Sequence, residues 1–291
     1  MFALSLLAVC LAAEPDKFDQ SGVPIEALPT DATLDKIVLI AGPASPKLKS
    51  GEHEYFAGCA ALAKLLRQTP GVFPVIVRDG KPANPATLKG AKAVVLFVEG
   101  AEVHAVVKHG LATDLDTLAK AGAGIVHLHS AIDYPKDFHE RSKAWSGAVW
   151  ETGHSLRAHW VTTLDGKVEH PATRGVGAFA IDDGWLWKLR FVDGLKGVTP
   201  LMRTVNPADA PGKTSAADSV VAWAYERPAG GRSFAYTGGH LHASLKSESY
   251  RRFLVNGILW SAGREVPPGG APVALTDAEL LRHYDAKPAK K

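Results

Sequence analysis

The strongest information about the fold lies in Val220–Arg227 (VVAWAYER), the turn Pro228–Gly231 (PAGG) and Arg232–His240 (RSFAYTGGH). Both flanks are rich in β-branched and aromatic residues, and a Pro/Gly turn joins them, which predicts a β-hairpin. The second strand stops at two glycines, which lack Cβ and let the backbone turn sharply near a ligand. The following histidine, His240, is suited to act as an acid, base or metal ligand near neutral pH. The apolar, amphipathic segment Tyr250–Ala262 predicts a helix that docks behind this site.

Upstream of the hairpin, short apolar runs alternate with amphipathic segments. The runs predict strands and the amphipathic segments predict helices, at Lys36–Ala41, His53–Gln68, Val72–Val77, Ala93–Val98, Leu111–Lys120 and Gly124–His129. This alternation predicts right-handed βαβ crossovers and a parallel sheet with helices on both faces. After residue 150 strand patterns dominate, at Leu156–Leu164, Ala178–Asp182 and Thr199–Thr204. The expected fold class is therefore α/β, a flavodoxin-like parallel sheet extended by antiparallel strands.

The composition is that of a globular protein. The 291 residues are 46% hydrophobic, enough for one large α/β domain with its own core. The net charge is +3, and Lys and Arg form no stripe interleaved with aromatics, so nucleic acid is not expected as a partner. No Gly-x-Gly-x-x-Gly fingerprint occurs, so no nicotinamide cofactor is expected.

The N-terminus resembles a signal peptide. Phe2–Ala13 is an apolar run that ends in small residues, too short to span a bilayer. This predicts a signal peptide over 1–13 and a periplasmic or secreted protein, and a lipoprotein box at Leu7–Cys10 stays open as an alternative. Cys10 would leave with the signal or carry lipid, so Cys59 is expected to have no disulfide partner. The remaining chain divides into a linker (14–35), one domain (36–265) and a surface tail (266–291) with a short helix within Leu275–Tyr284.

The ordered motifs resemble those of the ThuA-like (trehalose-utilisation) family. Its tail pattern has counterparts in Ala222-Trp223, Gly230–Tyr236, Gly239-His240 and Ile258–Gly263. Upstream, His170–Gly175 (HPATRG) resembles the family's His-Pro-Ile-Thr-Arg-Gly, and Asp182–Trp185 (DDGW) stands where the family has Asp-Glu-x-Tyr. The resemblance covers about 36–263. It implies the architecture of class I glutamine amidotransferases.

Three histidines are expected at the carboxyl ends of the strands, where open α/β sheets bind ligands. His53 follows the first strand, His129 ends the strand 124–129, and His240 ends the hairpin. They match the family patterns Gly-x-His-x-Tyr/Phe, Leu-His and Gly-Gly-His, and are candidates for catalysis and for a divalent metal such as zinc. Asp182 or Glu52 could complete the set of ligands around the metal. A catalytic zinc takes three protein ligands and keeps one position open.

Neighbouring residues need separate interpretations. His127 alternates with His129, so its side chain points to the opposite face and is expected in the core. His159 and His170 form a second group with Asp182 and Asp183; a proline after His170 restricts that histidine to extended geometry. Substrate contacts are expected from His159, His170 and the aromatic residues Tyr55 and Trp185, since sugars are often held by aromatic platforms.

Two hydrolytic alternatives depend on a nucleophile after the strand 124–129. A glutaminase needs a cysteine on that turn, but the turn carries His129-Ser130, and Cys59 lies within an amphipathic helix. Glutaminase activity is therefore not expected. Ser130 remains a candidate nucleophile for a serine hydrolase, although it lacks the glycines of a Gly-x-Ser-x-Gly elbow and suits a helix cap.

The resemblance implies a protein of trehalose or related disaccharide utilisation that acts on a 3-keto-sugar derivative, and the N-terminal run adds the expectation of export. A separate sugar dehydrogenase would make the ketone. A 3-keto group acidifies neighbouring C–H bonds, so a histidine could remove a proton while a metal or second histidine stabilises the enolate. Isomerisation, eliminative cleavage and hydrolysis all stay open. A non-catalytic sugar-binding module is the main alternative.

Overall fold

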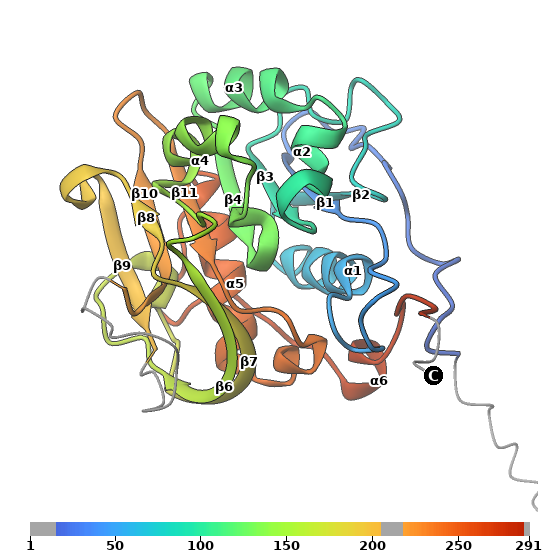
Figure 1. The fold of residues 1–291 in the computed structure, drawn as a ribbon. Coiled ribbons are helices and arrows are strands. Elements are labelled where there is room, and N and C mark those ends of the chain that lie inside the picture. The colour runs from blue at the N-terminus through green and yellow to red at the C-terminus, as the bar shows by residue number, and fades with distance from the viewer. Residues whose placement is uncertain (1–15, 205–217, 288–291) are drawn as a thin grey trace, which may run out of the picture.

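The computed structural model describes residues 16–204 and 218–287, which form an α/β fold around one large sheet (Figure 1). Its seven strands lie in the order β2-β1-β3-β4-β11-β10-β9. Their bounds are β1 Asp35–Ala41, β2 Val72–Val77, β3 Ala93–Phe97, β4 Gly124–Leu128, β9 Val198–Arg203, β10 Val220–Glu226 and β11 Arg232–Tyr236. Strands β2 to β11 in this order pair in parallel, while β10 is antiparallel to β11 and β9. The predicted fold class and hairpin are confirmed.

Helices cover both faces of this sheet (Figure 1). Helices α1 (Tyr55–Leu66) and α5 (Glu248–Ser261) pack on one face, and α2 (Ala105–Lys108), α3 (Ala112–Lys120) and α4 (His139–Ser146) pack on the other. Successive β1 residues therefore enter different cores: Leu39 belongs to the first and Ile40 to the second. Burial on both faces explains why the central strands are continuous apolar runs.

The second half of the chain adds two small antiparallel pairs. Strands β6 (Leu156–Leu164) and β7 (Phe179–Trp187) form a ribbon, and β5 (Ala148–Val149) pairs with β8 (Arg190–Phe191). The sequence predicts that the strand now seen as β7 ends at Asp182, but it continues to Trp187, where its tryptophans are buried. Helices α2 and α4 are absent from the sequence prediction. Both are short, with weak amphipathic patterns.

The two terminal segments pack against the domain. Ile25 bridges to Ile76 of β2, which ties part of the predicted linker to the edge of the sheet. The sequence predicts a surface tail from residue 266, whereas Val266, Val273 and Leu280 are buried. The predicted helix within 275–284 is the single turn α6 (Asp277–Leu280), which a Thr276/Glu279 capping box begins.

The predicted signal peptide and the lipoprotein alternative lie outside the described residues. Among those that are described, no helix is long and apolar enough to cross a membrane.

Candidate functional site

A cavity of about 750 Å³ lies at the carboxyl edge of the large sheet. Its floor comes from residues that follow strands of that sheet: 43–48 after β1, Glu99 after β3, His129 and Ser130 after β4, and His240 after β11. The ribbon contributes 157–159 of β6 and 184–186 of β7. The cavity therefore lies where parallel sheets bind their ligands, and the ribbon supplies part of its wall.

The three predicted histidines meet at this floor. One nitrogen from each of His53, His129 and His240 lies within 4.8 Å of the others, and the rings of His129 and His240 are both in contact with that of His53. His53 precedes α1 with φ +47°, and His129 begins the 3₁₀ turn η2 (His129–Ile132) with φ +53°. Such left-handed conformations are costly for histidine and are concentrated at functional sites.

Hydrogen bonds fix how two of the rings present their nitrogens. Nδ1 of His129 lies 2.9 Å from the carbonyl oxygen of Thr237, which can only accept, so Nδ1 carries the proton and Nε2 keeps its lone pair. Nδ1 of His53 lies 3.1 Å from Oε2 of Glu99, which likewise favours a proton on Nδ1. The two Nε2 atoms are 2.9 Å apart. Two lone pairs at this distance repel each other unless a proton or a cation lies between them.

Burial lowers the pKa values of His129 and His240 and so favours their neutral forms. It lowers the pKa of His129 well below its usual range, with the His53 charge adding to the effect. Burial and His53 also lower the pKa of His240 to about 4. Neutral imidazole is the form that binds metals, so the set resembles the three-histidine side of a catalytic zinc site.

Glu99 is a residue of the site that was not predicted from the sequence. Burial alone would raise the pKa of this carboxyl group, but the hydrogen bond and charge of His53, together with the Ser45 hydroxyl, lower it to about 2. Glu99 is therefore ionised and orients His53, as carboxylates behind metal-binding histidines do. Its position directly after a buried strand was the available signal. Tyr55, expected at the substrate, is instead fully buried with Oη 2.6 Å from Nδ1 of His53.

Glycines and a buried carboxylate position His240. Gly239 has φ +104°, a conformation that side-chain-bearing residues rarely adopt. A Cβ on Gly184 of β7 would come within 2.9 Å of the His240 side chain, so the ribbon makes room for the ring. The fully buried Asp183 carboxylate accepts backbone N–H groups from Gly239 (2.7 Å) and Leu241 (3.2 Å). Burial raises the pKa of Asp183 to about 6, although these bonds oppose the rise. Asp183 thus holds the turn that carries His240.

The remaining predicted site residues lie at different distances from this floor. His159 and Trp185 line the cavity, and Oδ1 of the exposed Asp182 lies 2.8 Å from Nε2 of His159. Asp182 is therefore behind His159 rather than among the three histidines. Glu52 lies 4.0 Å from Nε2 of His240. His170 is not among the residues lining the cavity; its ring packs on Trp260, and its Nδ1 accepts the N–H of Ala172.

Neither candidate nucleophile has the surroundings it would need. Cys59 is buried inside α1 without a disulfide, and burial raises the pKa of its thiol. Ser130 lines the cavity, but its neighbours include Tyr55, and no histidine is hydrogen-bonded to its hydroxyl in the described residues. At the turn after β4, where a glutaminase carries its cysteine, this chain has His129.

The fold and floor define a class of protein: an α/β protein with a mostly parallel sheet and a histidine-lined cavity at its carboxyl edge. The family model of ThuA, described as trehalose utilisation, matches residues 47–261, so this chain belongs to the ThuA family.

Solved structures give matches at low identity. A ThuA-like protein from Bacteroides uniformis matches with a TM-score of 0.57 and 14% identity, over 82% of this chain and 95% of that one. The CTPS glutaminase domain of Trypanosoma brucei matches at 0.45 and 13%, over 84% and 98%, and PurLQS of Thermotoga maritima at 0.45 and 12%, over 79% and 97%. No curated protein sequence matches. At these identities the similarity is one of fold.

Proposed function

We propose that this ThuA-family protein enolises a 3-keto-disaccharide at a site where His53, His129 and His240 hold a divalent metal such as zinc. The observation that supports it is the convergence of three imidazole nitrogens on the cavity floor. The Nδ1 atoms of His53 and His129 are each hydrogen-bonded to an acceptor on the protein. These contacts fit a metal: they fix the tautomers and leave the Nε2 lone pairs free. When bound, the metal would act as a Lewis acid toward the ketone oxygen.

His159 is the residue best placed to move the proton. It lines the same cavity, its ring contacts that of His240 with centroids 5.8 Å apart, and Asp182 orients it through Nε2. His159 would take a proton from the carbon next to the ketone, and the C–H electron pair would pass to the ketone oxygen as an enolate. Reprotonation at carbon gives isomerisation, whereas departure of the glycosidic oxygen gives elimination.

The test is consumption of a 3-keto-disaccharide by the purified domain, before and after chelation and zinc return. We expect turnover that chelation abolishes and zinc restores, with exchange of the C–H proton for deuterium from solvent. His159→Asn should lose the exchange and keep zinc binding, whereas His53→Ala should lose both. If the protein binds zinc and the sugar but shows neither proton exchange nor turnover, the proposed enzyme activity is wrong and a non-catalytic sugar-binding module is favoured.

Export is a separate proposal. The apolar run 2–13 supports cleavage after Ala13 and a periplasmic or secreted location. N-terminal sequencing of the protein from the periplasm of its host tests this, and recovery in the cytosol with residues 1–13 intact would contradict it. A sugar dehydrogenase that makes the 3-keto substrate is the proposed functional partner.

A further inference from the structure

Lys287, near the end of the chain, reaches the turn that carries His53. Its side chain is only 1% exposed, and its ammonium lies 3.0 Å from Oε1 of Glu54. It also donates to the carbonyl oxygens of Glu52 and, at 3.5 Å, of His53. An ammonium group has three N–H donors, and here each has an acceptor on the same short turn.

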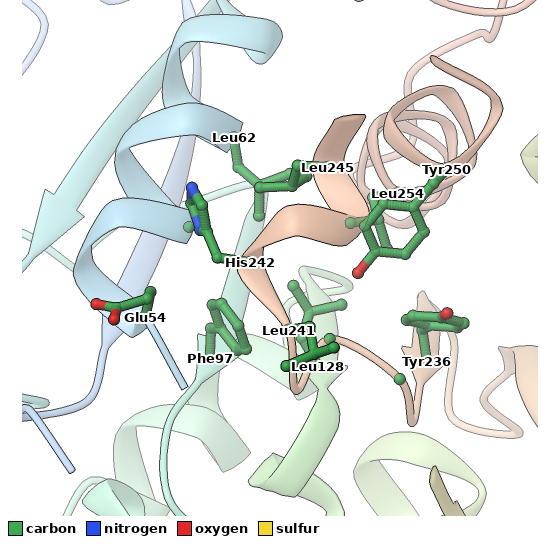
Figure 2. Close-up of a pocket in the computed structure, with 13 residues that line it drawn as sticks. Glu54, Leu62, Phe97, Leu128, Tyr236, Leu241, His242, Leu245, Tyr250 and Leu254 are labelled. Carbon is green, nitrogen blue, oxygen red and sulfur yellow. The ribbon is translucent and has the colours of Figure 1, made fainter. Parts of the chain in front are cut away.

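Glu54 needs this cation because its carboxylate is fully buried. The side chain is 0% exposed at the beginning of α1, and it borders a small, mostly apolar cavity of about 20 Å³ beside Phe97 and Leu241 (Figure 2). Its oxygens also accept the N–H groups of Gly51 (2.7 Å) and Asp285 (2.8 Å). Breaking one side of a buried ion pair leaves a charge without compensation, which is strongly unfavourable.

The same turn is joined to the His240 segment by backbone hydrogen bonds. The N–H of His53 donates to the carbonyl of His240 (2.9 Å), and the N–H of His242 donates to that of Gly51 (2.8 Å). The turn is thus held by the His240 segment on one side and by Lys287 and Glu54 on the other. Any loosening of the turn would displace two histidines of the floor together.

The segment that carries Lys287 is itself anchored. The Gln20 side-chain amide donates to the carbonyls of His283 and Tyr284, each at 3.0 Å, and the N–H of Tyr284 donates to Lys17. The family model ends at residue 261, so this support comes from outside the part of the chain that the model matches.

We propose that Lys287 is a positioning residue: with Glu54, it fixes the backbone of the turn 51–54 so that His53 and His240 direct their ring nitrogens to one point. The C-terminal segment thereby completes the site. The positioning role itself is independent of the proposed chemistry; only the zinc measurement below rests on the proposed function.

The direct test is amide hydrogen exchange of Lys287→Met, with Lys64→Met as the matched control. Lys64 pairs with Glu279, so it too joins the C-terminal segment to α1, but its side chain is 51% exposed and lies away from the turn. Loss of the clamp should speed exchange in 49–57 by about tenfold or more in Lys287→Met and leave it unchanged in Lys64→Met. Equal exchange in this segment for both variants would overturn the proposal.

Zinc affinity supplies the second readout. Lys287→Met should weaken zinc binding by about 10- to 100-fold, as loss of an outer-shell support does. If the wild type binds no zinc but the exchange contrast holds, the positioning role stands and the metal proposal fails. Should Lys287→Met not fold, Glu54→Gln/Lys287→Met removes both charges. This double variant should still show fast exchange in 49–57, and wild-type exchange there would overturn the proposal.

Discussion

Two histidine clusters lie at β4, one on a closed face of the strand and one at the turn that follows it, and only the second opens to a cavity. On the closed face, His127 Nε2 lies 3.1 Å from Tyr134 Oη, and the His104 ring stacks on Tyr134 with centroids 3.9 Å apart. Both ring nitrogens of His104 have a backbone partner: Nε2 lies 3.0 Å from the carbonyl oxygen of Ala131, and Nδ1 accepts the N–H of Val106. Both histidines are at most 1% exposed.

The open cluster differs in where its ring nitrogens point. In His53 and His129, the Nδ1 atoms bond to protein acceptors while the Nε2 atoms face each other at the cavity. Both clusters contain desolvated imidazoles with lowered pKa values, such as His129 in the open cluster and His104 in the closed one, so burial and lowered pKa do not distinguish a site from a core. What distinguishes the site is that the lone pairs of its ring nitrogens converge on a point that is accessible from the cavity.

The sharpest test of this contrast replaces His129 and His127 separately and compares the two variants. His129→Ala should lower turnover of the 3-keto substrate by at least about 100-fold, because it removes a ligand of the metal that would polarise the ketone. His127→Leu, two residues earlier in β4, should leave turnover per folded molecule unchanged. Steady-state kinetics on both variants, with circular dichroism to verify folding, measures this. An active His129→Ala enzyme would remove the open cluster from the mechanism.

A second test changes the support behind the open cluster and leaves its ligands in place. Glu99→Gln keeps the shape of the side chain but loses the charge that orients the His53 Nδ1 proton. Zinc affinity should fall by about 10- to 100-fold, the range for such outer carboxylates. Titration calorimetry measures it, and His104→Gln on the closed face serves as the control. Equal affinity in Glu99→Gln and wild type would show that Glu99 does not orient His53.

The histidines of the open cluster could be predicted from the sequence, but the residues that hold them in place could not. The strand ends at His129 and His240 could be read because the chain alternates apolar runs with turns, and parallel strands bring such ends to one edge. Glu99, Asp183 and Lys287 act through contacts across 46, 56 and 233 residues, with His53, Gly239 and Glu54 respectively. No local pattern contains such partners, and Lys287 looked like one of several basic residues in a tail.

The closed cluster should be visible in the acid stability of the protein. Burial lowers the pKa of His104 to about 4 and of His127 to about 3. The unfolded state takes up these protons near pH 6.5, so below that pH it binds more protons than the native state. Stability is therefore fully present above pH 6.5 and falls as the pH drops toward 4.

Removing one of these histidines should flatten that pH profile. Between pH 7 and pH 5, His127→Leu should lose about 1 to 2 kcal/mol less unfolding free energy than the wild type, because it has one buried histidine fewer to protonate. Urea unfolding at the two pH values measures the difference. Parallel profiles for the two proteins would mean that His127 is not held neutral in the native state.

The smallest expected effect concerns Ser130, which stands beside His129 at the same turn and lines the same cavity. A serine nucleophile needs a base at its hydroxyl, whereas the Ser130 hydroxyl lies with the Tyr55 phenol. Removing it costs at most a neutral hydrogen bond, worth about 0.5 to 1.5 kcal/mol of stability. Ser130→Ala should therefore keep turnover within about threefold of the wild type, an effect small beside the catalytic contribution of a true nucleophile. Loss of all turnover in Ser130→Ala, together with covalent labelling of the wild type by a fluorophosphonate, would instead assign the cavity to a serine hydrolase and leave the three histidines as its framework.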